Sequence, residues 1–252
     1  RVTPVAMFDT VRLAGADVSQ ASLHNVAYIH RLGGLRPGDV IEVSRRNDVI
    51  PAVESVLTSN GGMPFAPPTE CPSCASKLTF EGEHLVCTHD GCPATRIGGI
   101  RRWIEKTGVL NFGEGLITAL VEGNLVLDCA DIYNLKVSDM AACDMNGRKV
   151  GYATATRAVD ELIRRMELDL HVFVGALGIP HFGRSMVKVL VDAGFYSLDK
   201  LRGLTLQDLS QIEGVGPTKG QAFLTGLQDK SRLIDRLLDC GIKINSRNTT
   251  GS

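Results

Sequence analysis

The chain has 252 residues, a formal net charge of −1 and 44% hydrophobic residues. This length allows one or two domains with substantial cores, and no apolar run approaches the roughly 18 residues that a membrane-spanning helix needs. The near-zero charge and the lack of a Lys/Arg block disfavour a partner held by bulk electrostatics. A nucleic-acid partner would therefore have to be bound through local geometry.

The sequence shows no charged leader followed by a short apolar region, which predicts an intracellular, reducing compartment. Three cysteines far from the others along the chain are then expected to be reduced and to behave as small hydrophobic residues: Cys129, Cys143 and Cys240.

Residues 1–66 have the pattern of a small β-module. Short runs of alternating apolar and polar residues are separated by turn signals at Gly15 and at residues 33–34 and 37–39, and residues 22–32 have the spacing of one short helix. We predict a small β-barrel. Few strands precede the first turn, which indicates that the chain starts inside this domain.

Residues 67–96 contain two pairs of cysteines at short spacing. Tetrahedral Zn²⁺ takes four such ligands, and a two-residue gap lets both sulfurs of one turn reach the same ion. Short strands around residues 78–85 would bring the pairs together, but they are too small to fold without metal. We predict a closed, structural zinc site whose ligands are Cys71, Cys74, Cys87 and Cys92.

Other interpretations of these cysteines stay open at this point. Two disulfides or buried free thiols are the alternatives, and they fit poorly with an intracellular chain. His84 and His89 could in principle replace a cysteine ligand, although four thiolates leave no position for them.

From residue 97 to residue 245 the apolar spacing becomes helical, which predicts an all-α domain. A tight glycine turn recurs between the helices, and its final glycines lie 38, 32 and 33 residues apart, as in a repeat. We predict four helix-hairpin-helix units that end their turns at Gly113, Gly151, Gly183 and Gly216. Residues 246–252 are polar and are expected to form a linker or tail.

The fourth hairpin has the sharpest pattern, with Gly214, Gly216, Thr218 and Lys219 at the start of a helix. Two glycines permit positive φ and close backbone approach, and the helix start directs unpaired N–H groups outward. We expect a phosphate of nucleic acid there. Lys219 adds one charge.

The other hairpins vary at the first glycine position. Asn111 tolerates the left-handed conformation in the first, whereas Lys149 and His181 make the second and third weaker, and at least one of these is expected to pack rather than bind. All four turns could instead be compact corners of a helical core. Gly113 in the first hairpin and Gly183 in the third are also predicted to contact the nucleic acid.

Several motifs closely resemble the oligonucleotide-binding (OB) domain and the zinc finger of bacterial-type NAD⁺-dependent DNA ligases. Four occur in order and at matching spacing at residues 3–6, 22–25, 36–39 and 48–51, and the cysteine run follows where the family has it. Residues 176–179 match the family before the third hairpin. Two departures are Asn47, where glycine is usual, and residues 103–106, where the family commonly has Phe-x-Ser-Arg.

The resemblance implies DNA contacts in the first domain. It places Arg45 on the DNA backbone, and Val49 and Ile50 in the minor groove beside a nick. From the residues alone, Val49 and Ile50 would rather be assigned to the core. His24 and Asn25 are expected to be structural.

The resemblance also implies the activity of a whole enzyme, which moves AMP from NAD⁺ to a lysine and then to a 5′-phosphate, and seals nicks in replication and repair. Such an enzyme uses NAD⁺ and Mg²⁺, works in the cytoplasm on the nucleoid, and binds nicked duplex DNA. The family's Lys-x-Asp-Gly motif is absent from these 252 residues. The chain is therefore expected to be an inactive clamp that needs an adenylation domain, in cis or as a separate subunit.

A second interpretation is a non-catalytic DNA-junction binder built from an OB barrel and hairpins, with the zinc site as a spacer. An open reading frame that continues upstream into Lys-x-Asp-Gly would favour the ligase, and a native start near Arg1 would favour the junction binder.

Overall fold

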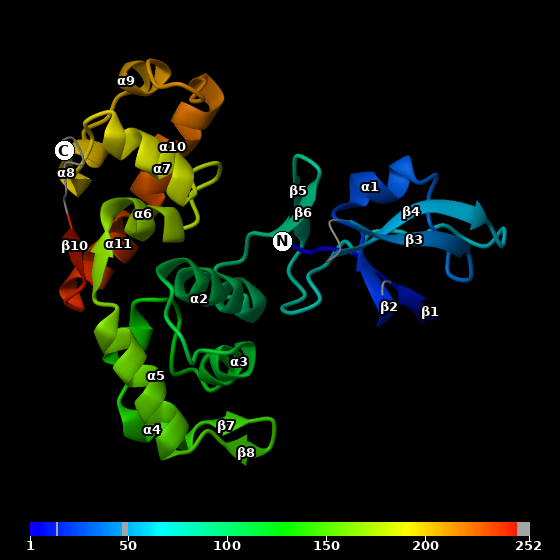
Figure 1. The fold of residues 1–252 in the computed structure, drawn as a ribbon, viewed down its shortest axis with the longest axis horizontal. Helices are drawn as coiled ribbons and strands as arrows, with labels where there is room; N and C mark the ends of the chain where they lie inside the picture. The colour runs from blue at the N-terminus through cyan, green and yellow to red at the C-terminus, as the bar shows by residue number, and fades with distance from the viewer. Residues whose placement is uncertain (14, 47–49, 246–252) are drawn as a thin grey trace. The chain divides into compact units, whose positions relative to one another are not determined.

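The computed structural model describes residues 1–13, 15–46 and 50–245. The chain forms two compact units, Arg1–Thr95 and Arg96–Ser252, whose elements are labelled in Figure 1. Each unit is described by itself below. The finer boundaries at residues 66 and 96 stay predictions.

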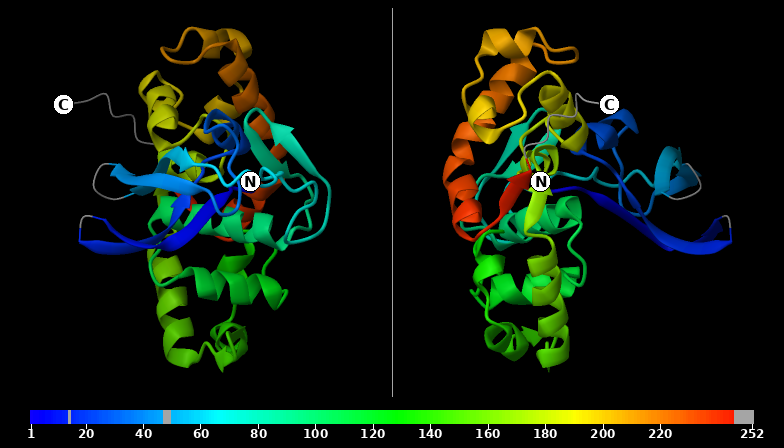
Figure 2. Two further views of the ribbon diagram at one scale, coloured as in Figure 1. Left: turned by 90° about the vertical axis from the view of Figure 1, so that its right-hand side faces the viewer. Right: turned by 60° about the vertical axis from the view of Figure 1, so that its left-hand side comes forward.

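The first unit is built on a four-stranded sheet in the order β1-β2-β4-β3. β1 pairs antiparallel with β2, and β3 pairs antiparallel with β4, while Ser22 and Ala52 join β2 and β4 in parallel. Figure 2 shows the strand pair β1-β2 in dark blue and the strand pair β3-β4 in light blue. The bounds are Val5–Leu13 for β1, Ala16–Ser22 for β2, Val40–Arg46 for β3 and Ile50–Thr58 for β4.

The predicted β-module is thus present, but the described strands form an open sheet rather than a closed barrel. β1 and β3 are its outer strands, and no described residue pairs one with the other. The core of this sheet is small and consists of Ala21, Leu23, Ile29, Leu35 and Val53.

Helix α1, Val26–Arg31, is fixed by Asn25 at its N-cap. The Asn25 side chain accepts a hydrogen bond from the backbone N–H of Tyr28 at 2.7 Å, which satisfies one of the helix's free donors. The Tyr28 hydroxyl donates to the carbonyl of Val53 at 2.6 Å. This second bond attaches the helix to β4.

The cysteine segment forms an antiparallel hairpin of β5, Leu78–Glu81, and β6, His84–Cys87. Gly82 makes the turn with φ +59°, a conformation that glycine adopts without steric cost. This hairpin brings Cys87 back beside the first cysteine pair, as the sequence predicts.

The second unit is mainly helical, as predicted, and adds two small two-stranded sheets, β7-β8 and β9-β10. Helix α2 begins at the end of the first unit. The bounds are Pro93–Thr107 (α2), Glu114–Glu122 (α3), Asp131–Asn134 (η1), Val137–Ala142 (α4), Asp144–Met145 (β7), Arg148–Lys149 (β8), Tyr152–Arg164 (α5), Glu167–Asp169 (β9), Leu170–Ala176 (α6), Arg184–Asp192 (α7), Leu198–Arg202 (α8), Leu206–Ser210 (α9), Pro217–Asp229 (α10), Ser231–Asp239 (α11) and Lys243–Asn245 (β10).

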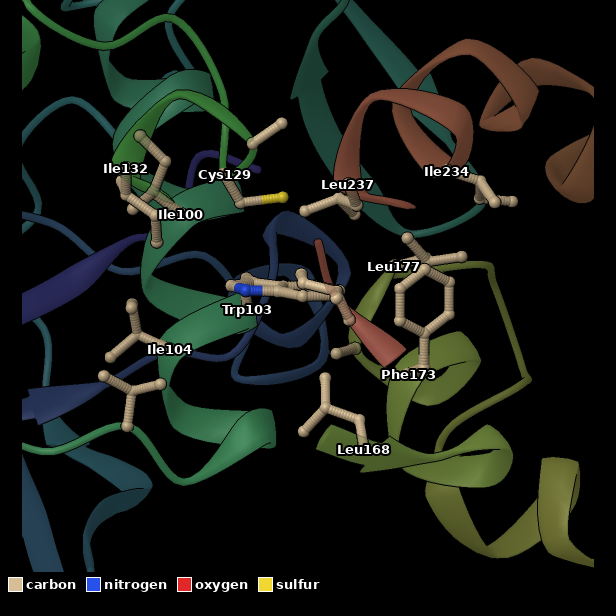
Figure 3. Close-up of a cluster of buried hydrophobic side chains, with 14 of the residues drawn as sticks. Ile100, Trp103, Ile104, Cys129, Ile132, Leu168, Phe173, Leu177, Ile234 and Leu237 are labelled. Carbon is tan, nitrogen blue, oxygen red and sulfur yellow. The ribbon is translucent and has the colours of Figure 1, made fainter. Parts of the chain in front are cut away.

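Trp103 lies at the centre of this unit's continuous core and is fully buried. Its ring meets Phe173 edge to face at a centroid distance of 5.5 Å (Figure 3). Its indole N–H donates to the Tyr133 hydroxyl at 2.9 Å, so the buried polar atom is satisfied. Residues 103–106, which depart from the family pattern, thus begin with a core anchor.

Candidate metal centre and nucleic-acid interface

The four predicted cysteines converge at one point of the first unit. All four Sγ atoms lie within 4.8 Å of one another, with 3.8 Å between Cys71 and Cys92 and 3.6 Å between Cys74 and Cys87. A disulfide would need about 2.0 Å. Zn–S bonds of about 2.3 Å in a tetrahedron place the sulfurs roughly 3.8 Å apart, so the geometry fits a Zn²⁺ ion.

The pKa values of the neighbouring thiols Cys74 and Cys87 are shifted in opposite directions, because burial and the adjacent thiols raise the pKa of Cys87. Hydrogen bonds from the side chain and the backbone of Ser76 lower the pKa of the Cys74 thiol to about 5. The thiolate is the form that binds metal. His84 and His89 do not join the cluster formed by the described residues, whose four members are all cysteines.

We expect one zinc ion per chain by elemental analysis. Cys74→Ser or Cys87→Ser should lower the metal content severalfold and loosen the hairpin, because the segment buries too few apolar side chains to hold itself. Cys240→Ser, at a cysteine outside the cluster, should leave the zinc content unchanged. Protein purified without chelator that contains no zinc would contradict the site.

The tip of the hairpin formed by β5 and β6 is bound to both ends of helix α1. Glu83 accepts hydrogen bonds from the Asn25 amide at 3.1 Å and from the Arg31 guanidinium at 3.0 Å. The backbone N–H of Val2 also donates to the Leu85 carbonyl at 2.8 Å. Asn25 is therefore structural, as expected, while His24 is exposed and meets the Tyr28 ring edge on.

Glu83→Ala should destabilise the first unit by about 1–2 kcal/mol, because the amide of buried Asn25 loses its acceptor. The exposed pair with Arg31 contributes little of this. Thermal or urea unfolding of the chain measures the effect. Glu81→Ala, at an exposed residue beside the same turn, is the matched control, and equal destabilisation by both variants would rule out the bond.

Three of the four predicted hairpins share one backbone geometry. Asn111, His181 and Gly214 are left-handed, with φ of +64°, +67° and +80°. The N-cap glycine two residues later is extended in each: φ is −70° at Gly113, −76° at Gly183 and −82° at Gly216. Of the two glycines that permit positive φ in the fourth hairpin, Gly214 adopts it and makes the turn, whereas Gly216 does not.

The second hairpin differs from the others. Lys149 lies in strand β8, and Gly151 itself has φ +78°. His181 adopts the left-handed conformation of the glycine that it replaces, although this replacement was expected to weaken the third hairpin. The second and third hairpins therefore differ in backbone geometry, whereas the sequence pattern made the same prediction for both.

The helix starts after these turns expose free backbone donors. No side chain forms a capping hydrogen bond at the N-caps of α3, α5, α7 and α10. A Cβ built on Gly113, Gly183 or Gly216 would meet nothing within 4 Å. Free N–H groups and the helix dipole favour an anion at such a position.

Most predicted hairpin contacts are accessible. Lys219 is half-buried, and its ammonium donates to the Gly214 carbonyl at 3.0 Å, so it supports the turn. The exposed hairpin residues are Asn111, Gly113, Gly183, Gly214, Gly216 and Thr218.

In the first domain, Arg45 pairs with Pro51 and Ile50 pairs with Arg46 across β3 and β4. Val49 lies outside the described residues.

Comparison with known proteins finds matches for the sheet of the first unit and for two of the hairpins of the second unit. Residues 1–62 match the NAD-dependent DNA ligase OB-fold domain. Residues 172–232, which contain the third and fourth hairpins, match the helix-hairpin-helix motif.

Proteins named DNA ligase are similar along nearly the whole chain. The one from Sorangium cellulosum is 42% identical over 242 residues, which are 96% of this chain and 35% of the relative. Those from Natronomonas pharaonis and Coprothermobacter proteolyticus are 35% and 31% identical, over 87% and 99% of this chain and 31% and 38% of the relatives.

These similarities support the assignment of the chain to the C-terminal portion of an NAD-dependent DNA ligase. The chain spans about a third of the length of the relatives it matches. Along the described ranges, no helix combines the length and the apolarity that crossing a membrane requires.

Proposed function

We propose that the chain is the DNA-clamping part of an NAD⁺-dependent DNA ligase, which joins a 5′-phosphate to a 3′-hydroxyl at a nick during replication and repair. The observation that carries this proposal is the repeated hairpin, in which an uncapped helix start follows a left-handed residue. The match to ligase OB-fold and hairpin families supports it.

The hairpins bind DNA phosphates through backbone amides. Gly113, Gly183 and Gly216 let a phosphate approach the helix start, because they present no side chain. Asn111 and Gly214 set the turn, Thr218 lies in the first helical turn, and Lys219 stabilises the loop. Such contacts carry no sequence information, which suits an enzyme that acts on nicks in any sequence.

The sheet module adds a second contact to the duplex. Arg45 binds the backbone, and Val49 and Ile50 enter the minor groove beside the nick, as the ligase resemblance implies. The zinc site keeps the hairpin of residues 78–87 folded against this module through Glu83.

The chemistry belongs to another domain, because Lys-x-Asp-Gly does not occur in these residues. That adenylation domain binds NAD⁺ and Mg²⁺ and is either part of the same polypeptide or a separate subunit. The whole enzyme works in the cytoplasm, where its substrate DNA forms the nucleoid.

Gly216→Val should weaken binding to nicked duplex about tenfold or more, because its side chain blocks amide hydrogen bonds to a charged phosphate. The fold should survive, since Gly216 has negative φ and open space around its Cβ position. Fluorescence anisotropy with a labelled nicked duplex measures the affinity, and circular dichroism checks the fold.

Gly98→Val is the matched control, because this glycine lies in α2 away from the turns and also has open space. It should leave the affinity unchanged. If folded Gly216→Val binds as tightly as the original chain, or if Lys219→Ala is the more harmful change, the amide contact is wrong.

A nick-sealing assay tests the function itself. The chain alone should not seal a nick, whereas the chain mixed with a separately produced adenylation domain and NAD⁺ should. Chain with Gly216→Val should seal more slowly at low DNA concentration. Binding to junctions with no sealing in any mixture would favour the non-catalytic DNA-junction binder.

A further inference from the structure

The second hairpin carries a short β-ribbon, formed by β7 and β8, that the helical spacing of this region does not predict. Asp144 pairs with Lys149, and Met145 pairs with Arg148. Residues 146–147, Asn-Gly, make the turn with φ of +57° and +79°, the left-handed pair that closes a two-residue hairpin loop. The second turn residue also donates its backbone N–H to the Asp144 carboxylate at 2.9 Å. The ribbon is therefore a defined element despite its small size.

The register of the ribbon determines which side chains share a face. Residues that pair directly across two strands point to the same side. Met145 and Arg148 therefore share one face, and Asp144 and Lys149 share the other. The Lys149 ammonium donates to the Ala142 carbonyl at 2.7 Å, so its face turns back towards the end of α4.

Met145 attaches the first of these faces to the first hairpin. It packs against the core of the second unit, and a Cβ built on Gly115 would lie 3.4 Å from its sulfur. Gly115 is the second residue of α3, directly after the turn that ends at Gly113. The face that carries Arg148 thus lies beside the start of α3, next to which the ribbon is seen in Figure 1.

The charges around this helix start leave Arg148 available. Glu114, the first residue of α3, already lies 3.4 Å from the guanidinium of Arg101. Arg148 is exposed, and its guanidinium has no hydrogen bond or ion pair with any residue that the structure describes. A guanidinium without a carboxylate partner can bind two oxygens of one phosphate at once.

We propose that Arg148 binds a phosphate of the DNA backbone beside the first hairpin, and that the ribbon of the second hairpin holds it there. The inference rests on the proposed clamp function, which places DNA at the start of α3. It gives the second hairpin a contact to DNA through a side chain of its ribbon. The guanidinium also offsets the repulsion between a phosphate and the Glu114 carboxylate.

Arg148→Gln should weaken binding of the chain to a nicked duplex roughly fivefold at low salt, because one charged contact to a phosphate is lost. The slope of the logarithm of the binding constant against that of the salt concentration should become shallower by about one. Lys149→Gln is the matched control, because it removes an equal charge from the opposite face of the same ribbon. It should leave the slope unchanged. Fluorescence anisotropy at several salt concentrations measures both quantities, and thermal unfolding checks the fold.

Gly147→Val tests the position of the guanidinium, because this change keeps every charge. A β-branched residue resists the φ of +79° at this position, so the turn that aims Arg148 is lost. Binding should weaken about as much as in Arg148→Gln. The double variant should bind no worse than either single variant, because both remove the same contact.

Equal effects of Arg148→Gln and Lys149→Gln would show that net charge alone acts and would overturn the proposal. Unchanged binding by folded Arg148→Gln would do the same. If Gly216→Val weakens binding but Arg148→Gln does not, only the ribbon contact is wrong. A chain that binds no nicked duplex at all would overturn the clamp function together with this contact.

Discussion

Free N–H groups at four helix starts are the feature of the second unit on which its proposed function depends. A capping side chain normally satisfies one of them, but glycine stands at the N-caps of α3, α5, α7 and α10. These donors remain available to an external acceptor. The proposed binding of phosphate in this way would need few positive side chains, which is consistent with the net charge of −1.

The first unit depends on support from outside its own small cores. The core under the sheet contains five buried apolar residues, and the hairpin of β5 and β6 is held by the four clustered cysteines and by contacts to α1 and Val2. Such modules bury too little surface to be stable alone. The Glu83 hydrogen bonds compensate for part of that deficit, and a metal ion held by the four cysteines would add to it.

Local sequence predicted the features that depend on short spacing. The cysteine cluster and the positions of the hairpin glycines could be read directly, because nearby residues determine them. The backbone conformations of His181 and Gly216 could not, because the residue type at these positions does not determine φ. The role of Glu83 could not be predicted either, because its partners Asn25 and Arg31 lie more than 50 residues away along the chain. The unpaired outer strands could not be predicted because the sequence does not give the strand order.

The three hairpins of shared geometry differ in the charge at their first helical position. α3 begins with Glu114, which is exposed and lies 3.4 Å from Arg101, whereas α7 begins with Arg184 and α10 with Pro217. A carboxylate in the first turn stabilises the helix but repels a phosphate at the same amides, and a guanidinium has both effects reversed. Helix stability and anion affinity are therefore opposed at this position. The third hairpin, with Arg184 and a left-handed His181, has the arrangement that most favours a phosphate.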